Sequence, residues 1–371
     1  MGRLRPTHSG RLERWLGAER LTQLGQNMKG WYGPPIHLLD CPGSVRVTAD
    51  GDFLGPFDRG FFMSAMDAFE AAVKRAAKIP HSTCYAGFSS ISDALSRASQ
   101  GFSVYPGGMF AKTGPTGVVG VTSSLHKLGP QPIAGVAAAA APGGTAYVDT
   151  DTGGMQFANP SVGTTRLVGA DVCCSVINNS LLLYDRIFAV AKTMNSVATE
   201  AVTGVPTRYQ SVTTTAEDYI GGNFGFVEVG LTALAATAHN WTVCTYLDQA
   251  NAASTLPSLT GNSGAITHRL DHPVGQWFAP LAAGDVGIKA WTQMQCSALV
   301  ATGLINFVIG HPIGFMSFPV INSVMPFDWL TNRDQAPRIF DDAYLAFLEI
   351  CKPATTSTLY GGRIAATSTS S

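Results

Sequence analysis

The second half of the chain alternates apolar segments of strand length with turn-forming residues, and this pattern constrains the fold most strongly. Turn signals such as Gly221-Gly222, His239-Asn240 and Gly284-Asp285 separate the segments, and no helical segments alternate with them. Many short strands at near-regular spacing are typical of an antiparallel sandwich or barrel. The predicted strands cover residues 165–175, 180–190, 223–236, 240–248, 286–299, 302–309, 313–321 and 343–350.

Two features near the C-terminus complete this pattern. Gly310-His311-Pro312 predicts a turn between two of the strands. Segment 343–350 also suits a helix, because its apolar residues recur at helical spacing. Gly361-Gly362 and the threonines before it predict a hairpin return, so we interpret the segment as a strand.

Charged residues are scarce in this chain. They make up 13% of it, against 46% hydrophobic residues, whereas a typical globular chain carries about 25% charged residues. Residues 161–330 hold only six Arg or Lys and ten Asp or Glu. Large subunit interfaces are depleted of charge at their centres. We therefore expect partners to cover much of the surface, most simply copies of the same chain.

The N-terminal arm, residues 1–30, is basic, with six Arg or Lys and two Glu. Its apolar residues predict one face of an amphipathic helix between Gly10 and Gly25. Three interpretations stay open: a docked helix with a solvated basic face, non-specific contact with DNA, or contact with a neighbouring subunit. The apolar residues of this face are Leu12, Trp15, Leu16 and Leu24.

The rest of the first 100 residues predicts a hairpin and two helices. Residues 44–58 form the hairpin, with its turn at Asp50-Gly51. A helix from Phe62 ends before Pro80, and a shorter one covers 90–99. The predicted fold class is therefore α+β, with a helical N-terminal part and an antiparallel sandwich or barrel. The predicted domains are residues 1–100, 101–164 and 165–371.

The middle domain, residues 101–164, is dominated by Gly, Pro, Ala and Thr. A loop of this length is uncommon inside a compact domain. We expect an extended segment that lies over neighbouring subunits in an assembly and gains its order from them.

The seven cysteines give no disulfide pattern, because their number is odd and no CxxC occurs. We expect reduced, buried thiols and assembly in a cytoplasm. No apolar run reaches the roughly 18 residues of a membrane span. Arginines interrupt the N-terminus where a signal peptide would have its apolar core, so secretion by that route is not expected.

Two segments have spacings that suggest metal binding. His268 and His272 stand four residues apart, but Pro273 follows and glycines precede, and no HExxH supplies a general base. Asp149–Gly154 resembles the start of a calcium loop but lacks the downstream Glu. We interpret the first as an exposed polar loop and the second as a turn, so no metal or cofactor is predicted.

Catalytic patterns are equally weak. The glycines between 114 and 120 are not followed by the Lys-Ser/Thr pair of a phosphate loop, and no Gly-x-Ser-x-Gly occurs. Asp341-Asp342 are adjacent carboxylates and predict a surface position. We therefore predict no catalytic residue and no enzyme activity.

Several short segments of the β region resemble tailed-bacteriophage virion structural proteins. These proteins have a similar "yDR" segment, a "pLaaGDxGv" turn between strands and a C-terminal hairpin of small residues. The resemblance covers about residues 120–365 and carries no catalytic residue; the N-terminal third departs from it. The matching segments are Leu183–Arg186, Trp241–Val243 with Tyr246, Phe278–Gly287, Gly303–Phe307 leading into Gly310–Pro312, Asp342–Phe347 and Leu359–Ile364.

The resemblance implies a virion protein that assembles with copies of itself and with other virion proteins in the host cytoplasm. A capsid shell component is our first expectation, and a tail tube or tail-associated subunit is the second. A carbohydrate-binding, adhesive sandwich is the rival from another class, with Trp277, Trp291 and Trp329 as the aromatic candidates. A hydrolase on a β scaffold would need a nucleophile–base pair that the sequence does not offer.

Overall fold

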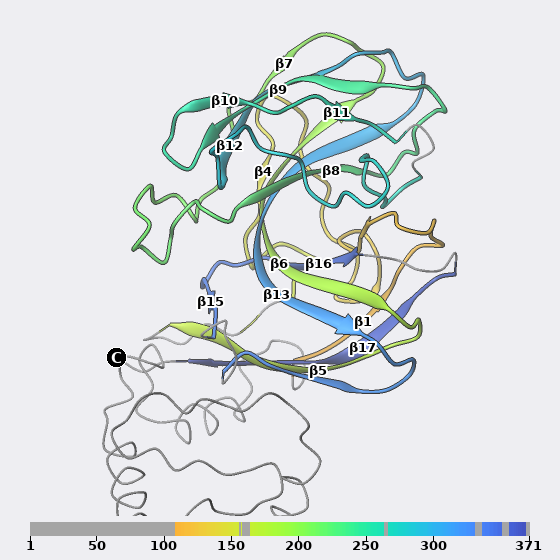
Figure 1. The fold of residues 1–371 in the computed structure, drawn as a ribbon, viewed down its shortest axis with the longest axis vertical. Helices are drawn as coiled ribbons and strands as arrows, with labels where there is room; N and C mark the ends of the chain where they lie inside the picture. Colours follow the sequence, from red (N-terminus) through yellow and green to blue (C-terminus); the bar gives the residue numbers. More distant parts are fainter. Residues whose placement is uncertain are drawn as a thin grey trace, which may run out of the picture. The chain divides into compact units, whose positions relative to one another are not determined.

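The described residues form an all-β unit made of three antiparallel sheets (Figure 1). They belong to one compact part of the chain, Pro80–Ser371. Within the described ranges no helix is present, so none could cross a membrane. This computed structural model describes residues 108–155, 157, 164–262, 266–330, 336–350 and 356–368.

The central sheet, ordered β2-β16-β6-β13-β8, contains the two longest strands. β6 (Asn179–Thr193) and β13 (Leu304–Phe318) pair along almost their whole length. β16 (Leu345–Ile350) lies on the other side of β6, and β8 (Phe224–Val229) pairs with the first part of β13. The short strands of this sheet are β2 (Ser123–Ser124) and β4 (Thr145–Ala146).

A lower and an upper sheet, named from their places in Figure 1, pack against the central one. The lower sheet holds β1 (Met109–Thr113), β3 (Pro130–Gln131), β5 (Thr165–Cys174), β14 (Met325–Asp328), β15 (Arg338–Ile339) and β17 (Leu359–Ser368). The upper sheet holds β7 (Glu200–Ala201), β9 (Asn240–Asp248), β10 (Ala253–Thr255), β11 (Leu259–Thr260) and β12 (Ile288–Cys296).

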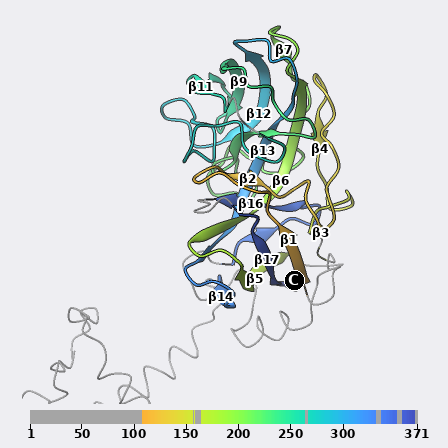
Figure 2. The same ribbon diagram turned by 90° about the vertical axis from the view of Figure 1, so that its right-hand side faces the viewer.

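The long strands β6 and β13 belong to two apolar cores at once, and Figure 2 shows them running from the upper to the lower sheet. Their upper part packs on Trp241 and Trp291 of the upper sheet. Their lower part packs on Leu167 and Ile364 of the lower sheet. A third apolar cluster includes Phe226 of β8 and is covered by loops. The central sheet is therefore buried on both faces, which explains why its strands are nearly continuous apolar runs.

The predicted α+β class is wrong for the described part of the chain. The segments predicted as helices, and the hairpin at 44–58, lie outside the described residues. From residue 108 onward every element is a strand, because β-branched and aromatic residues pack on a pleated surface between Gly- and Pro-containing turns. The strands predicted at 165–175, 180–190, 240–248 and 343–350 are confirmed as β5, β6, β9 and β16.

The turn predicted at Gly310-His311-Pro312 is wrong, because β13 runs straight through it. The pairing of β13 with β6 shifts register after Ile309 and again after Pro312, which marks bulges. β8 pairs with β13 only up to Gly310. The missing N–H of Pro312 therefore costs no hydrogen bond to β8, and a bulge accommodates it on the β6 side.

The predicted C-terminal hairpin is also wrong. β16 belongs to the central sheet, whereas β17 lies between β5 and β1 in the lower sheet. β1 comes from the segment predicted to be extended, 101–164, and pairs there within the same chain. Long-range pairing, rather than pairing of sequence neighbours, thus builds this sheet.

Candidate functional site

The segment Leu183–Arg186, which carries part of the resemblance, lies in the middle of β6 and is completely buried. Consecutive strand residues point to opposite faces of a sheet. Asp185 and Arg186 therefore direct opposite charges to opposite sides of the central sheet. Each charge has a partner there, and the two ion pairs differ in what they hold together.

Asp185 pairs with Arg208, which comes from the loop between β7 and β8. The Arg208 Nε donates to Asp185 Oδ2 at 2.6 Å, and its Nη2 donates to Oδ1. Arg208 Nη1 also donates to the carbonyl of Tyr147 at 2.8 Å, and the amide of Tyr344 donates to Asp185 Oδ1 at 3.1 Å. This pair thus fastens two loops and the approach to β16 onto β6.

Arg186 pairs with Glu228 of β8 across β13. Its two terminal nitrogens donate to the two carboxylate oxygens at 2.6 and 3.2 Å, and Asn306 of β13 donates to the same carboxylate at 3.0 Å. Burial by itself would raise the pKa of Glu228, but the charge and hydrogen bonds of Arg186 lower it to about 2. Glu228 is therefore ionised, and the pair fixes the order of three strands.

Aromatic rings close over the Arg186 side of the sheet. The guanidinium carbon of Arg186 lies 4.8 Å from the centre of the Tyr147 ring. His126 packs edge-on against Tyr147 and Tyr344, and its Nε2 bonds the carbonyl of Val136 at 3.0 Å. Burial and the Arg186 charge hold the pKa of His126 well below its usual value. The side chains of this assembly are buried, and it can hold loops in place.

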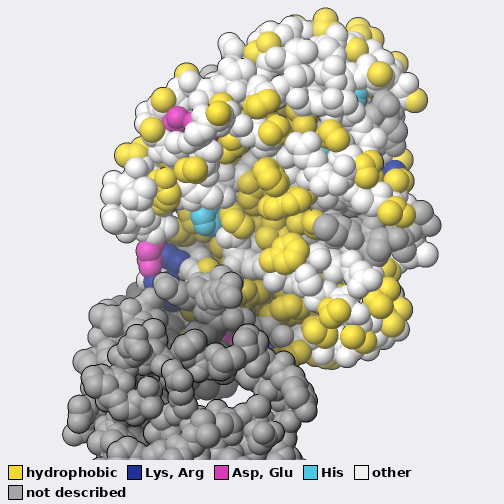
Figure 3. All heavy atoms as spheres, viewed as in Figure 1, with side chains coloured by type: hydrophobic (Ala, Val, Ile, Leu, Met, Phe, Trp, Pro, Cys, Tyr) yellow, Lys and Arg dark blue, Asp and Glu magenta, His cyan; other side chains and the backbone are white. Residues whose placement is uncertain are grey.

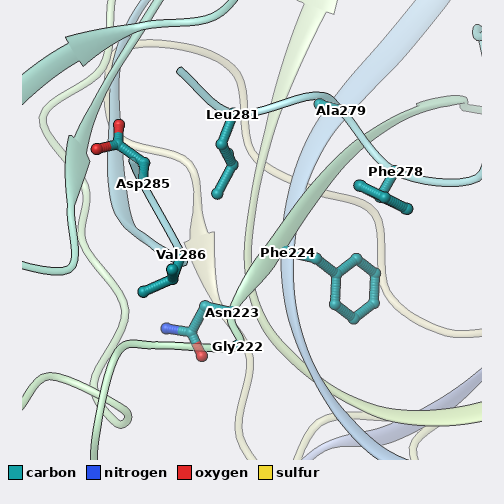
Figure 4. A pocket seen from close by; sticks show the side chains of 8 residues that line it. All are labelled: Gly222, Asn223, Phe224, Phe278, Ala279, Leu281, Asp285 and Val286. Atoms are coloured by element: carbon teal, nitrogen blue, oxygen red, sulfur yellow. The ribbon is translucent and has the colours of Figure 1, made fainter. Parts of the chain in front are cut away.

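The segment Phe278–Gly287 also lies where the resemblance places a turn, and it borders a shallow pocket of about 300 Å³ (Figure 4). Gly284 has a φ of 94°, as the tight turn requires. Tyr246 holds the turn from below: its hydroxyl donates to Asp285 at 2.6 Å and accepts from the amide of Ala282 at 2.9 Å. The pocket is lined by Gly222, Asn223, Phe224, Phe278, Ala279, Leu281, Asp285 and Val286.

This pocket is mostly apolar, with two aromatic rings facing Leu281 and Val286 across it. Its carboxylate, Asp285, is already bonded to Tyr246, and none of the eight lining residues is a His, Ser, Cys or Lys. A nucleophile–base pair is therefore not among the lining side chains. The pocket suits an apolar side chain better than a reacting substrate.

The exposed polar loop predicted for His268 and His272 is wrong for His272. His272 is buried, and its Nε2 accepts the backbone amide of Val227, whereas His268 is half-buried with a φ of 73°. Asp151 accepts the amide of Val148 within the predicted turn. In the described part of the chain, no three His, Cys, Asp or Glu side chains are arranged to hold a metal ion.

The aromatic and cysteine candidates are mainly core residues. Trp291 and Trp329 are buried, and Trp277 is half-buried against Phe224. An adhesive surface would need these rings exposed, so their burial does not favour sugar binding. The four cysteines among the described residues are thiols; Cys174, Cys244 and Cys296 are buried, as predicted, whereas Cys173 is half-buried.

Positive charge is almost missing from the surface of the described residues. Six of their ten Lys and Arg side chains are buried, and Arg363 is the one in the exposed class. Figure 3 shows few charged side chains on the face it displays, and hydrophobic ones gathered between β6 and β8. The six buried cations are Lys112, Arg166, Arg186, Lys192, Arg208 and Arg269.

Four exposed apolar side chains, Ile177, Val320, Ile321 and Leu359, lie at one end of the lower sheet, which we call the apolar end. Each is 49% to 57% exposed. Backbone hydrogen bonds bring their loops together: Asn178 to Phe318, Asn322 to Cys174 and Ser175 to Leu359. No charged residue occurs in 290–327, 175–178 or 356–360. The apolar end is therefore a surface suited to cover by another apolar surface.

Sequence reasoning missed the partners Arg208 and Glu228. The sequence did contain a signal for Glu228, because it is the only charged residue between Asp218 and Asp248. A single charge inside an apolar strand predicts burial with a partner, since an unpaired buried charge is too costly. The sequence does not reveal which partner it meets.

The chain matches no protein-family model, no curated protein and no solved structure. These comparisons therefore do not test the expected likeness to virion proteins. The function has to be inferred from the core and the surface of the molecule itself.

Proposed function

We propose that this chain is a virion structural protein that assembles with copies of itself, most simply as a capsid shell component of a tailed bacteriophage. The observation that carries the proposal is the distribution of charge. Six of the ten described Lys and Arg side chains are buried and the apolar end is bare of charge, and such a surface gains about 25 cal/mol per Å² of apolar area on being covered. The proposed role is structural and needs no cofactor.

The core suits this role. Ion pairs buried at the centre of the sheet tie three strands and several loops into one arrangement. A subunit that repeats many times in a shell has to present the same surface in every copy. We propose that it meets other virion proteins as well, and that it assembles in the host cytoplasm before residing in the virion.

The N-terminal arm has a place in this proposal. Residues 1–30 are basic, whereas residues 161–330 carry four more acidic than basic residues, and most of the latter are buried. We propose that the arm contacts the acidic surface of a neighbouring subunit rather than packaged DNA. Deleting residues 1–25 is then expected to prevent assembly, and normal particles from the truncated protein would contradict this contact between subunits.

Sedimentation and negative-stain microscopy of the purified protein test the proposal. A homo-oligomer far larger than the 39.0 kDa chain is expected at physiological salt. Closed shells would support the capsid role, and tubes would support the alternative, a tail tube or tail-associated subunit. A stable monomer at micromolar concentration would contradict self-assembly.

A further inference from the structure

β8 is the last strand of the central sheet, and the segment His268–Ala279 covers its outer edge. Its amides and carbonyls bond β8 in the alternating pattern of a strand pair. His268 donates to the carbonyl of Val229 at 3.0 Å, and Val229 donates to the carbonyl of Arg269 at 2.8 Å. Ala279 donates to the carbonyl of Gly225 at 2.7 Å. The segment therefore replaces an edge strand.

At Val227 a side chain takes the place of a backbone acceptor. The amide of Asp271 donates to the carbonyl of Val227 at 2.8 Å, as a paired strand would. The amide of Val227, however, donates to Nε2 of His272 at 2.9 Å. Nε2 can accept this bond only while it carries no proton. A proton on Nε2 would set two N–H groups against each other in a buried position.

One charged group of its own segment, Asp271, acts on this ring. The Asp271 carboxylate adjoins His272, but it is engaged by His239 Nε2 and Trp241 Nε1, both at 2.9 Å, and by the amide of Asn262 at 2.6 Å. Burial lowers the pKa of His272 to about 4, against the opposing effects of Asp271 and the Phe278 carbonyl. Asp271 thus anchors the segment while His272 titrates.

We propose that His272 is an acid-operated latch: its protonation breaks the bond to Val227 and releases His268–Ala279 from the edge of β8. An uncovered edge strand presents unpaired amides and carbonyls to other chains. The latch therefore determines whether this edge of the central sheet can pair with a further strand. This inference does not depend on the proposed virion role.

Hydrogen exchange of the intact protein, followed by mass spectrometry and corrected for intrinsic rates, tests the latch. Peptides covering 224–229 and 266–281 are expected to lose roughly 20-fold of their protection between about pH 7 and pH 5, because the released ring returns to an ordinary pKa. Peptides of β5 and β9 are expected to stay better protected at pH 5, because they open only when the whole unit unfolds. Equal protection of all strands at pH 5, or no loss at the β8 edge, would overturn the latch.

Two variants distinguish the acid response of His272 from that of another histidine, His311. His272→Gln offers a carbonyl oxygen that accepts the Val227 amide at any pH, so the acid response of 266–281 should disappear. His311→Gln removes a histidine of β13 whose pKa burial also lowers to about 4, and should leave that response intact. An acid response that persists in His272→Gln would overturn the proposal. If that variant does not fold, the wild-type exchange profile still decides.

Discussion

The middle of the central sheet and the apolar end differ in where charged side chains lie. In the middle, two carboxylates and two guanidiniums are buried and paired, although each is costly to remove from water. At the apolar end, four large aliphatic side chains are exposed and their segments, 290–327, 175–178 and 356–360, contain no charged residue. A typical monomer reverses this arrangement. The difference indicates that charge in this chain specifies internal order, and that the surface is left for contact.

The largest expected effect comes from breaking a pair in the middle. Glu228→Gln keeps the shape of the side chain but leaves the Arg186 guanidinium buried without a countercharge. We expect the free energy of unfolding to fall by about 3–5 kcal/mol, measured by urea denaturation.

Asp171→Asn is the matched control on the surface. The Asp171 carboxylate pairs with Arg363 at 3.1 Å, and both side chains are about half exposed. An exposed pair contributes about 1 kcal/mol or less, so this variant should stay close to the wild type. Equal losses in the two variants would show that burial does not distinguish the two pairs.

Acid should weaken the interior through its neutral histidines. Burial lowers the pKa of His311 to about 4, whereas the unfolded chain binds a proton near the ordinary value of about 6.5. Below that value the unfolded state takes up more protons, so stability falls as the pH falls. We expect His311 to account for about 2 kcal/mol of the loss between about pH 7 and pH 5.

The measurement compares how steeply the free energy of unfolding changes with pH in the wild type and in His311→Gln. Urea denaturation of both proteins at both pH values gives this slope. The variant loses the ring that stacks on Tyr209 at a centroid distance of 3.8 Å, so its stability at neutral pH will also drop. Its slope should nevertheless be shallower, and an unchanged slope would refute the role of His311.

Local pattern predicted the strands of the middle well and their connections poorly. β6 and β9 were readable because apolar runs or alternation fill them between clear turn signals. Gly310-His311-Pro312 has the composition of a turn, but pairing with β6 on both sides of it overrides that local preference. The partners of Asp185 and Arg186 lie 23 and 42 residues away. Which distant charge a strand meets depends on topology, and spacing along one chain does not encode it.

A smaller effect is expected at the bulge in β13, where its pairing with β6 shifts register. A Cβ at Gly310 would lie 2.6 Å from a ring atom of Tyr184 and 3.2 Å from Phe224. Gly310→Ala therefore has to displace buried rings, and we expect a loss of about 1–2 kcal/mol in unfolding free energy. Gly143→Ala is the control, because a Cβ there meets nothing within 4 Å. Similar losses at both positions would contradict close packing at the bulge.

The smallest effect on stability is expected at the apolar end, together with the clearest effect on assembly. Ile321→Lys changes a side chain that is half-exposed, so the unfolding free energy should stay within about 0.5 kcal/mol of the wild type. In the proposed assembly the same lysine would be buried without a partner, which is strongly unfavourable. Sedimentation should therefore shift from large assemblies towards monomer.

Leu231→Lys is the matched control for this change. Leu231 is also exposed, and it lies near Leu304, where β13 begins, whereas the apolar end adjoins Phe318, where β13 ends. Both variants add one positive charge to the subunit, so a general effect of charge would act on both alike. If the apolar end is a contact between subunits, only Ile321→Lys should block assembly. Equal assembly of the two variants and the wild type would mean that this surface is left uncovered, and that the exclusion of charge from it has another cause.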